Sequence, residues 1–243
     1  MKAVIPFLVL LAAITLAPAT APAQPAEQTE RIAASFMLAL GRAPSAGETE
    51  SWAKQGPLSV ADLIARLRTQ LATDPAAKQA MVVKAGEDAF GRTPSGDEIA
   101  RWSEGAHTYT ELVQAQLAWL AGRPADYAQV LQRAYQFFLR RDPYPTEVSY
   151  WKSRPTLSYA LLVACLENWA RRNQPGLMET SGDATVSVNS GFLTTVRLSP
   201  AIAAEVRAAI GFPAAPAPGH NLIAAGAKGI VSAGGIHFVA AGR

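Results

Sequence analysis

The chain has 243 residues, of which 49% are hydrophobic and 17% are charged, so it is long and apolar enough to bury one or two cores. That composition excludes a disordered chain. The formal net charge is only +3, and lysines and arginines are scattered among acids, which argues against a nucleic-acid-binding surface. The single cysteine, Cys165, cannot form an internal disulfide, and its leucine neighbours predict a buried, unreactive thiol.

Residues 1–23 have the features of a secretory signal peptide. Lys2 precedes an apolar stretch, and Ala21-Pro22-Ala23 has the small-residue pattern of a cleavage site. Ala17-Pro18-Ala19 is an alternative site. The apolar stretch is too short to span a membrane. The sequence therefore predicts a periplasmic or secreted protein whose mature chain begins at Gln24.

One motif then recurs three times, with a period of 50 and then 49 residues. In each copy Arg, Pro, Glu and Trp lie 1, 3, 7 and 11 residues after the first position of a turn. These residues are Arg42, Pro44, Glu48 and Trp52; Arg92, Pro94, Glu98 and Trp102; and Arg141, Pro143, Glu147 and Trp151. A period of this length is typical of structural repeats stacked in series.

Each copy predicts a long helix before the motif. The helix opens at a proline, which suits the first helical position, and its apolar residues then follow the spacing of one helical face. Gly41 and Gly91 are expected to take the left-handed conformation that ends a helix. Arg140 stands at the same place in the third copy and predicts a differently shaped helix end.

A short second helix and a longer third helix are expected to follow. Ser45 and Glu48 have the spacing of a capping box, in which each side chain satisfies an amide of the other residue, and the second copy repeats it. In the third copy Thr146 is the expected cap. The tryptophan four residues after each glutamate is expected to seal the unit, and the arginine to hold a glutamate or a helix end.

These patterns predict a mainly α fold: an array of three helical repeats with about three helices each, a small α+β segment and a β-prone tail rich in Gly and Ala. The expected boundaries are repeats at 24–73, 74–123 and 124–174, a hairpin-plus-helix segment at 175–212, a Pro/Ala linker at 213–219 and the tail at 220–243.

The tail carries a smaller repeat with a period of 8 residues. Two apolar residues, two small residues and a glycine recur at 222–226, 230–234 and 238–242. This pattern favours short strands that associate with copies of themselves or with another surface; the alternative is a flexible end. No aspartate lies between 219 and 243, so a calcium-binding glycine repeat is not predicted.

The run Leu40-Gly41-Arg42-Ala43-Pro44, with Tyr150-Trp151 in the last copy, resembles a bacterial helical repeat family known as domain of unknown function 4214. The resemblance covers residues 25–172, although Ser51 and Arg101 replace the family's tyrosine in the first two copies. That family is similar to the helical linker domains of phycobilisomes, and its members are commonly secreted. The resemblance implies no catalytic residues.

No catalytic, cofactor or metal site is predicted. His107, His220 and His237 lie in unlike contexts without a second ligand nearby. The expected function is that of an exported, non-enzymatic structural or interaction protein of the envelope or extracellular matrix, with a protein or matrix component as its partner. The alternative is a saccharide-binding or saccharide-acting envelope protein that uses grooves of Trp and Glu. Open tryptophans beside Glu48 or Glu98 would favour the alternative, and shielded ones the scaffold.

Overall fold

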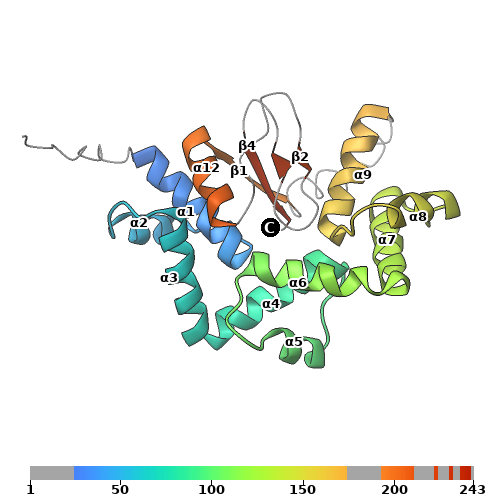
Figure 1. Ribbon diagram of the computed structural model, residues 1–243, viewed down its shortest axis with the longest axis horizontal. Helices are drawn as coiled ribbons and strands as arrows, with labels where there is room; N and C mark the ends of the chain where they lie inside the picture. Colours follow the sequence, from blue (N-terminus) through green and yellow to red (C-terminus); the bar gives the residue numbers. More distant parts are fainter. Residues whose placement is uncertain (1–24, 174–192, 211–221, 224–229, 232–235, 242–243) are drawn as a thin grey trace, which may run out of the picture.

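The computed structural model describes residues 25–173, 193–210, 222–223, 230–231 and 236–241 (Figure 1). It is mainly helical, as the sequence predicts. The predicted signal peptide, the Pro/Ala linker and much of the tail lie outside the described residues. No helix in the described part of the chain has the length and apolar character needed to cross a membrane.

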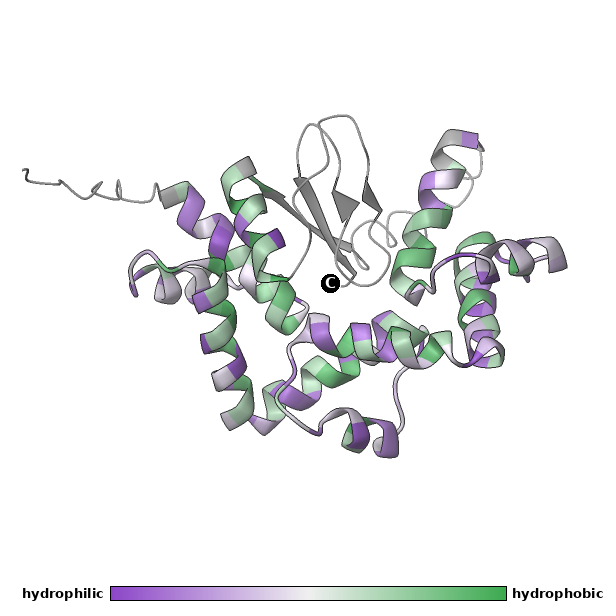
Figure 2. Cartoon of the chain, viewed as in Figure 1, coloured by the Kyte–Doolittle hydropathy of each residue, from purple (hydrophilic) through white to green (hydrophobic). Residues whose placement is uncertain are grey.

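Nine helices between residues 25 and 173 fall into three consecutive triplets, which we call units one, two and three. Unit one has α1 (Pro25–Leu40), α2 (Ala46–Ala53) and α3 (Val60–Thr73); unit two has α4 (Pro75–Phe90), α5 (Gly96–Trp102) and α6 (Tyr109–Ala121); unit three has α7 (Pro124–Leu139), α8 (Pro145–Lys152) and α9 (Tyr159–Asn173). The first helix of each unit has 16 residues. Figure 2 shows hydrophilic and hydrophobic residues on different sides of α3, whose buried residues are Val60, Leu63, Leu67 and Leu71.

The short second helices begin largely as predicted. Ser45 and Ser95 cap α2 and α5 in complete capping boxes, which confirms the two predictions. Thr146 as the cap of the third copy is wrong: α8 begins one residue earlier, at Pro145, after Tyr144. Proline fixes the backbone for the first helical turn and donates no N–H, so this helix starts without a serine or threonine cap.

The ends of the first helices have one common shape. Gly41 and Gly91 are left-handed, with φ of 72° and 69°. Arg140 is left-handed too, with φ of 55°, so the expected difference at the end of α7 is wrong. A residue with a Cβ pays roughly 1–2 kcal/mol for this conformation. The third unit therefore has the same left-handed turn, although glycine, the residue that adopts this conformation most readily, is replaced by Arg140.

Adjacent units meet through a tyrosine that packs on a glycine. The first residue of α6, Tyr109, lies on Gly41 of unit one, and the first residue of α9, Tyr159, lies on Gly91 of unit two. A Cβ at either glycine would lie 2.4 Å from a ring carbon. The glycines are therefore required for the close approach of the next unit as well as for the turn.

The first unit is covered by the C-terminal part of the chain. Beyond α9 the structure describes β1 (Leu193–Leu198), α12 (Pro200–Ala209), β2 (Leu222–Ile223), β3 (Ile230–Val231) and β4 (Ile236–Ala241). α12 buries Ile202 and Val206 in a cluster that includes Val60 of unit one. Arg31 of α1 donates hydrogen bonds to Oε1 of Glu205 at 2.7 and 3.0 Å and to its Oε2 at 3.1 Å. Burial and an ion pair thus hold this segment against α1.

The strands form two small antiparallel sheets. β1 pairs with β4 over six residues, from Leu193 with Ala241 to Leu198 with Ile236, and β2 pairs with β3. One strand of the hairpin predicted within 175–212 is therefore present as β1, and its partner is a strand of the tail. The other half of that hairpin lies outside the described residues.

Gln116 of α6 offers a test of the packing. It is 0% exposed, and neither atom of its amide has a hydrogen-bond partner among the described residues. Units one and three have Leu67 and Leu166 at the equivalent place. Because an unsatisfied buried polar group costs about 1–3 kcal/mol, Gln116→Leu should raise the free energy of unfolding by about that amount in urea denaturation.

The exposed Gln79 of α4 gives the matched control, and Gln79→Leu should change stability by less than about 0.5 kcal/mol. A loss of stability in Gln116→Leu would contradict this account, because it would mean that the amide makes buried hydrogen bonds.

Candidate functional site

The recurrent arginine and glutamate form the same two-pronged ion pair in every unit. In unit two Arg92 donates to both oxygens of Glu98, at 2.7 and 2.6 Å. The distances are 2.8 and 2.6 Å between Arg42 and Glu48, and 2.7 and 2.8 Å between Arg141 and Glu147. Planar guanidinium and carboxylate groups match in this arrangement, which makes it stronger than a single contact.

Each ion pair is also tied to the backbone of the turn. Glu98 accepts the backbone N–H of Ser95 at 2.8 Å, and Arg92 donates to the carbonyl of Thr93 at 3.3 Å. Glu48 and Glu147 accept the corresponding N–H groups of Ser45 and Tyr144. The pair therefore joins the turn after the first helix to the first turn of the second.

These bonds fix the charge of the glutamates. Hydrogen bonding to the arginine, opposed by burial and aided by the backbone, lowers the pKa of Glu48 and of Glu98 to about 2. The pKa of Glu147 is lowered for the same first cause. A general acid needs a carboxyl group whose pKa is raised toward neutrality, so the geometry supports a structural role for these three side chains.

The recurrent tryptophans and prolines complete the turn. Trp52 packs edge-on against Phe36 with ring centroids 6.1 Å apart, and the Trp151 indole N–H donates to the Tyr135 hydroxyl at 2.9 Å. Trp52, Trp102 and Trp151 are all half-buried against the cores. Pro94 is buried, and the other two prolines of the motif are half-buried. This shielding favours the scaffold over a row of open tryptophans.

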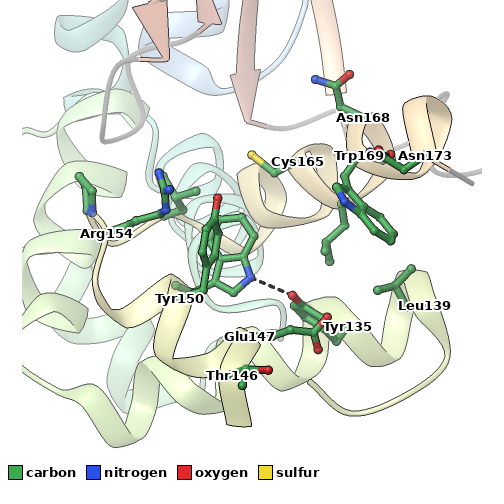
Figure 3. A pocket seen from close by; sticks show the side chains of 14 residues that line it. Tyr135, Leu139, Thr146, Glu147, Tyr150, Arg154, Cys165, Asn168, Trp169 and Asn173 are labelled. Atoms are coloured by element: carbon green, nitrogen blue, oxygen red, sulfur yellow. Dashed lines mark hydrogen bonds between the residues drawn. The ribbon is translucent and has the colours of Figure 1, made fainter. Parts of the chain in front are cut away.

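Unit three has a cavity that sequence analysis missed. It has a volume of about 760 Å³ and lies between the end of α7, α8 and α9 (Figure 3). The residues that line it are Tyr135, Leu139, Thr146, Glu147, Tyr150, Trp151, Arg154, Pro155, Leu157, Cys165, Leu166, Asn168, Trp169 and Asn173. A run of aromatic residues in the third copy was the one signal in the sequence that could have found it.

Aromatic exposure is concentrated in the same unit. Tyr144, Tyr150 and Trp169 are 60%, 50% and 44% exposed, and they are the only exposed large hydrophobic side chains in the described part of the chain. Trp119 is the counterpart of Trp169 in unit two, but it packs edge-on against Phe90 and is half-buried. Unit three therefore presents aromatic surface that the other units do not.

Charge at the cavity comes from two residues with different environments. The Glu147 carboxylate is neutralised by Arg141, as described above. Arg154 lies over the Tyr150 ring, 4.2 Å from its centroid, and has no carboxylate partner among the described residues. The unbalanced charge at the cavity is therefore positive.

Cys165 also lines the cavity, and its side chain is half-buried, whereas the sequence predicts a buried thiol. Burial raises the pKa of the thiol, which favours its protonated form. Side chains do not fill the space beside α9 completely, so Cys165 borders the cavity.

One buried carboxyl group lies outside this cavity. Asp88 of α4 is 4% exposed and accepts hydrogen bonds from Lys84 at 2.6 Å and from the Tyr109 hydroxyl at 2.7 Å. Burial raises its pKa to about 6, although both partners oppose the shift. The group supports the tyrosine that joins units one and two, and it is not part of the lining of the unit three cavity.

The predicted absence of a metal site rested on the histidines. His107 is exposed, and His220 and the side chain of His237 lie outside what the structure describes. Within the described residues, no group of three or more His, Cys, Asp or Glu side chains is placed to hold a metal ion.

No family model, curated protein or solved structure matches this chain. The resemblance to the bacterial helical repeat family therefore stays a prediction.

The Arg–Glu pair predicts a stability effect with a defined pH dependence. Arg92→Ala should lower the free energy of unfolding near neutral pH by about 1–2 kcal/mol, after allowance for the partly exposed arginine. The folded pKa of Glu98, about 2, is below its ordinary value of 4.5, so its contribution is present above pH 4.5 and is lost as the pH falls toward 2. The difference between the two proteins should shrink over that window, as measured by urea denaturation at a series of pH values.

Arg101, an exposed arginine of the same unit, supplies the control, and Arg101→Ala should cost less than about 0.5 kcal/mol. Equal losses for the two alanine variants, or a difference that is constant from neutral pH down to 2, would show that the pair does not stabilise the turn.

Proposed function

We propose that the protein is an exported, non-enzymatic structural or interaction protein of the bacterial envelope or extracellular matrix. Three copies of one helical module form its scaffold, and the C-terminal tail serves for self-association or for attachment to a matrix component. Its site of action is the periplasm or the exterior of the cell, as the N-terminal pattern predicts.

The observation that carries this proposal is the use of the recurrent polar residues. In all three units the arginine and the glutamate are bonded to each other and to the backbone of one turn. A role repeated in every unit is that of a structural part, as in other stacked-repeat proteins. The motif therefore supports a scaffold, and no reactive group is left over in it.

The tail is proposed as the attaching element because of its strands. β4 already adds to β1, which shows that this segment can pair with a strand edge. In the two-stranded sheet that they form, each strand has its second edge without a strand partner among the described residues. Such edges can pair with another chain, and a surface strand supplies main-chain hydrogen bonds for that purpose.

A second candidate function is saccharide binding. The observation that favours it is the aromatic cavity of unit three. The saccharide would therefore bind in unit three and not beside Glu48 or Glu98. Catalysis on a saccharide has less support, because Glu147 is held ionised by Arg141.

Deletion of residues 220–243 tests the role of the tail. The helical units should remain folded by circular dichroism, because the buried residues described in their core clusters all lie between Ile32 and Val206. The apparent mass in light scattering, or the fraction of protein retained in the envelope, should fall relative to the full-length mature protein. A variant in which a Gly/Ser sequence of equal length replaces the tail controls for chain length.

The proposal is overturned if the full-length mature protein is a plain monomer that leaves the cell as readily as both variants.

A further inference from the structure

We infer that the cavity of unit three binds an acidic saccharide, that is, a sugar ring bearing a carboxylate. This site goes beyond the proposed scaffold and tail and does not depend on either. Its size is suitable: about 760 Å³ falls within the range of roughly 300–1,000 Å³ that is usual for small-molecule sites.

Two flat aromatic side chains supply the stacking surfaces. Tyr150 of α8 and Trp169 of α9 flank the space between these helices (Figure 3). They are 50% and 44% exposed, so both side chains are partly accessible to a ligand. An aromatic face attracts the weakly positive C–H groups of a ligand, and a sugar ring presents such groups on its faces.

The cavity also contains polar groups between its apolar surfaces. Thr146, Asn168 and Asn173 contribute a hydroxyl and two amides to the lining. Asn173 donates one hydrogen bond to the carbonyl of Trp169 at 2.8 Å, and its carbonyl oxygen remains as an acceptor. A ligand with apolar faces and a hydroxylated edge matches this mixture better than a purely apolar one, which would leave the carbonyl oxygen of Asn173 desolvated.

Charge selects an acidic ligand. Arg154 and Glu147 are the charged side chains in the cavity lining, and Glu147 is engaged by Arg141 and by the Tyr144 N–H. The Arg154 guanidinium carbon lies 4.2 Å from the centroid of the Tyr150 ring, and the guanidinium has no hydrogen-bond acceptor among the described residues, so its N–H groups can serve a ligand. This arrangement suits two parallel hydrogen bonds to a carboxylate. The arginine would then hold the acid group while the neighbouring tyrosine contacts the ring.

The test is a calorimetric titration of the mature protein with trigalacturonate and trimannuronate, which carry the same carboxylates on rings of different stereochemistry. The methyl ester of trigalacturonate and 4-hydroxyphenylacetate serve as a neutral sugar and an aromatic acid. At least one of the two uronates should bind, and the neutral ester should bind at least about tenfold more weakly, the effect of losing one charged hydrogen bond.

Arg154→Gln and Trp169→Ala should each weaken that binding at least about tenfold. The matched control is Arg123→Gln in unit two, where Arg123 lies 4.1 Å over the Trp119 ring, outside the cavity, and this variant should bind normally. Circular dichroism of each variant verifies that the helices remain folded.

Three results would overturn the inference: no binding of either uronate up to about 10 mM, undiminished binding of the neutral ester, or undiminished binding by folded Arg154→Gln. Tighter binding of 4-hydroxyphenylacetate than of both uronates would do the same and would assign the cavity to aromatic acids. None of these results bears on the tail, whose role is tested separately by its deletion.

Discussion

The contact on which the array depends is the packing of a tyrosine ring on a left-handed glycine. Tyr109 covers Gly41, and Tyr159 covers Gly91, so the third helix of one unit starts on the end of the first helix of the unit before it. The ring needs the space that a Cβ would take, and the turn needs a positive φ; glycine satisfies both conditions. The Arg–Glu pair next to each glycine holds the following turn in place, which fixes where the second helix begins.

At each end of the array, one partner of the tyrosine–glycine contact is replaced by another residue. In unit one, Val60 takes the place of the tyrosine and packs with α12, so the chain closes this end with its own C-terminal segment. In unit three, Arg140 stands where the other units have glycine. By analogy with Gly41 and Gly91, its Cβ would collide with a tyrosine ring packed at this position. A stacked array needs such ends to stay soluble. The aromatic cavity lies in unit three, the last of the three units.

Sequence reasoning could predict what depends on nearby residues. The capping boxes and the arginine that holds a glutamate involve positions three and six residues apart, so the motif itself revealed them. Contacts between distant segments are not encoded by any local motif. Arg31 and Glu205 are 174 residues apart, and the tyrosine of each joint lies in a different copy from its glycine. The cavity was missed because it results from incomplete filling between helices, which no motif encodes.

Measuring the stability of Gly91→Ala against Gly96→Ala tests the joint most directly. At Gly91 the new Cβ would lie 2.4 Å from the Tyr159 ring at a φ of 69°, whereas at Gly96 it would meet nothing within 4 Å. Crowding and left-handed strain together predict a loss of about 2–4 kcal/mol for Gly91→Ala, and no loss for Gly96→Ala, where a helical alanine is favoured. Equal stability of the two variants would contradict the account.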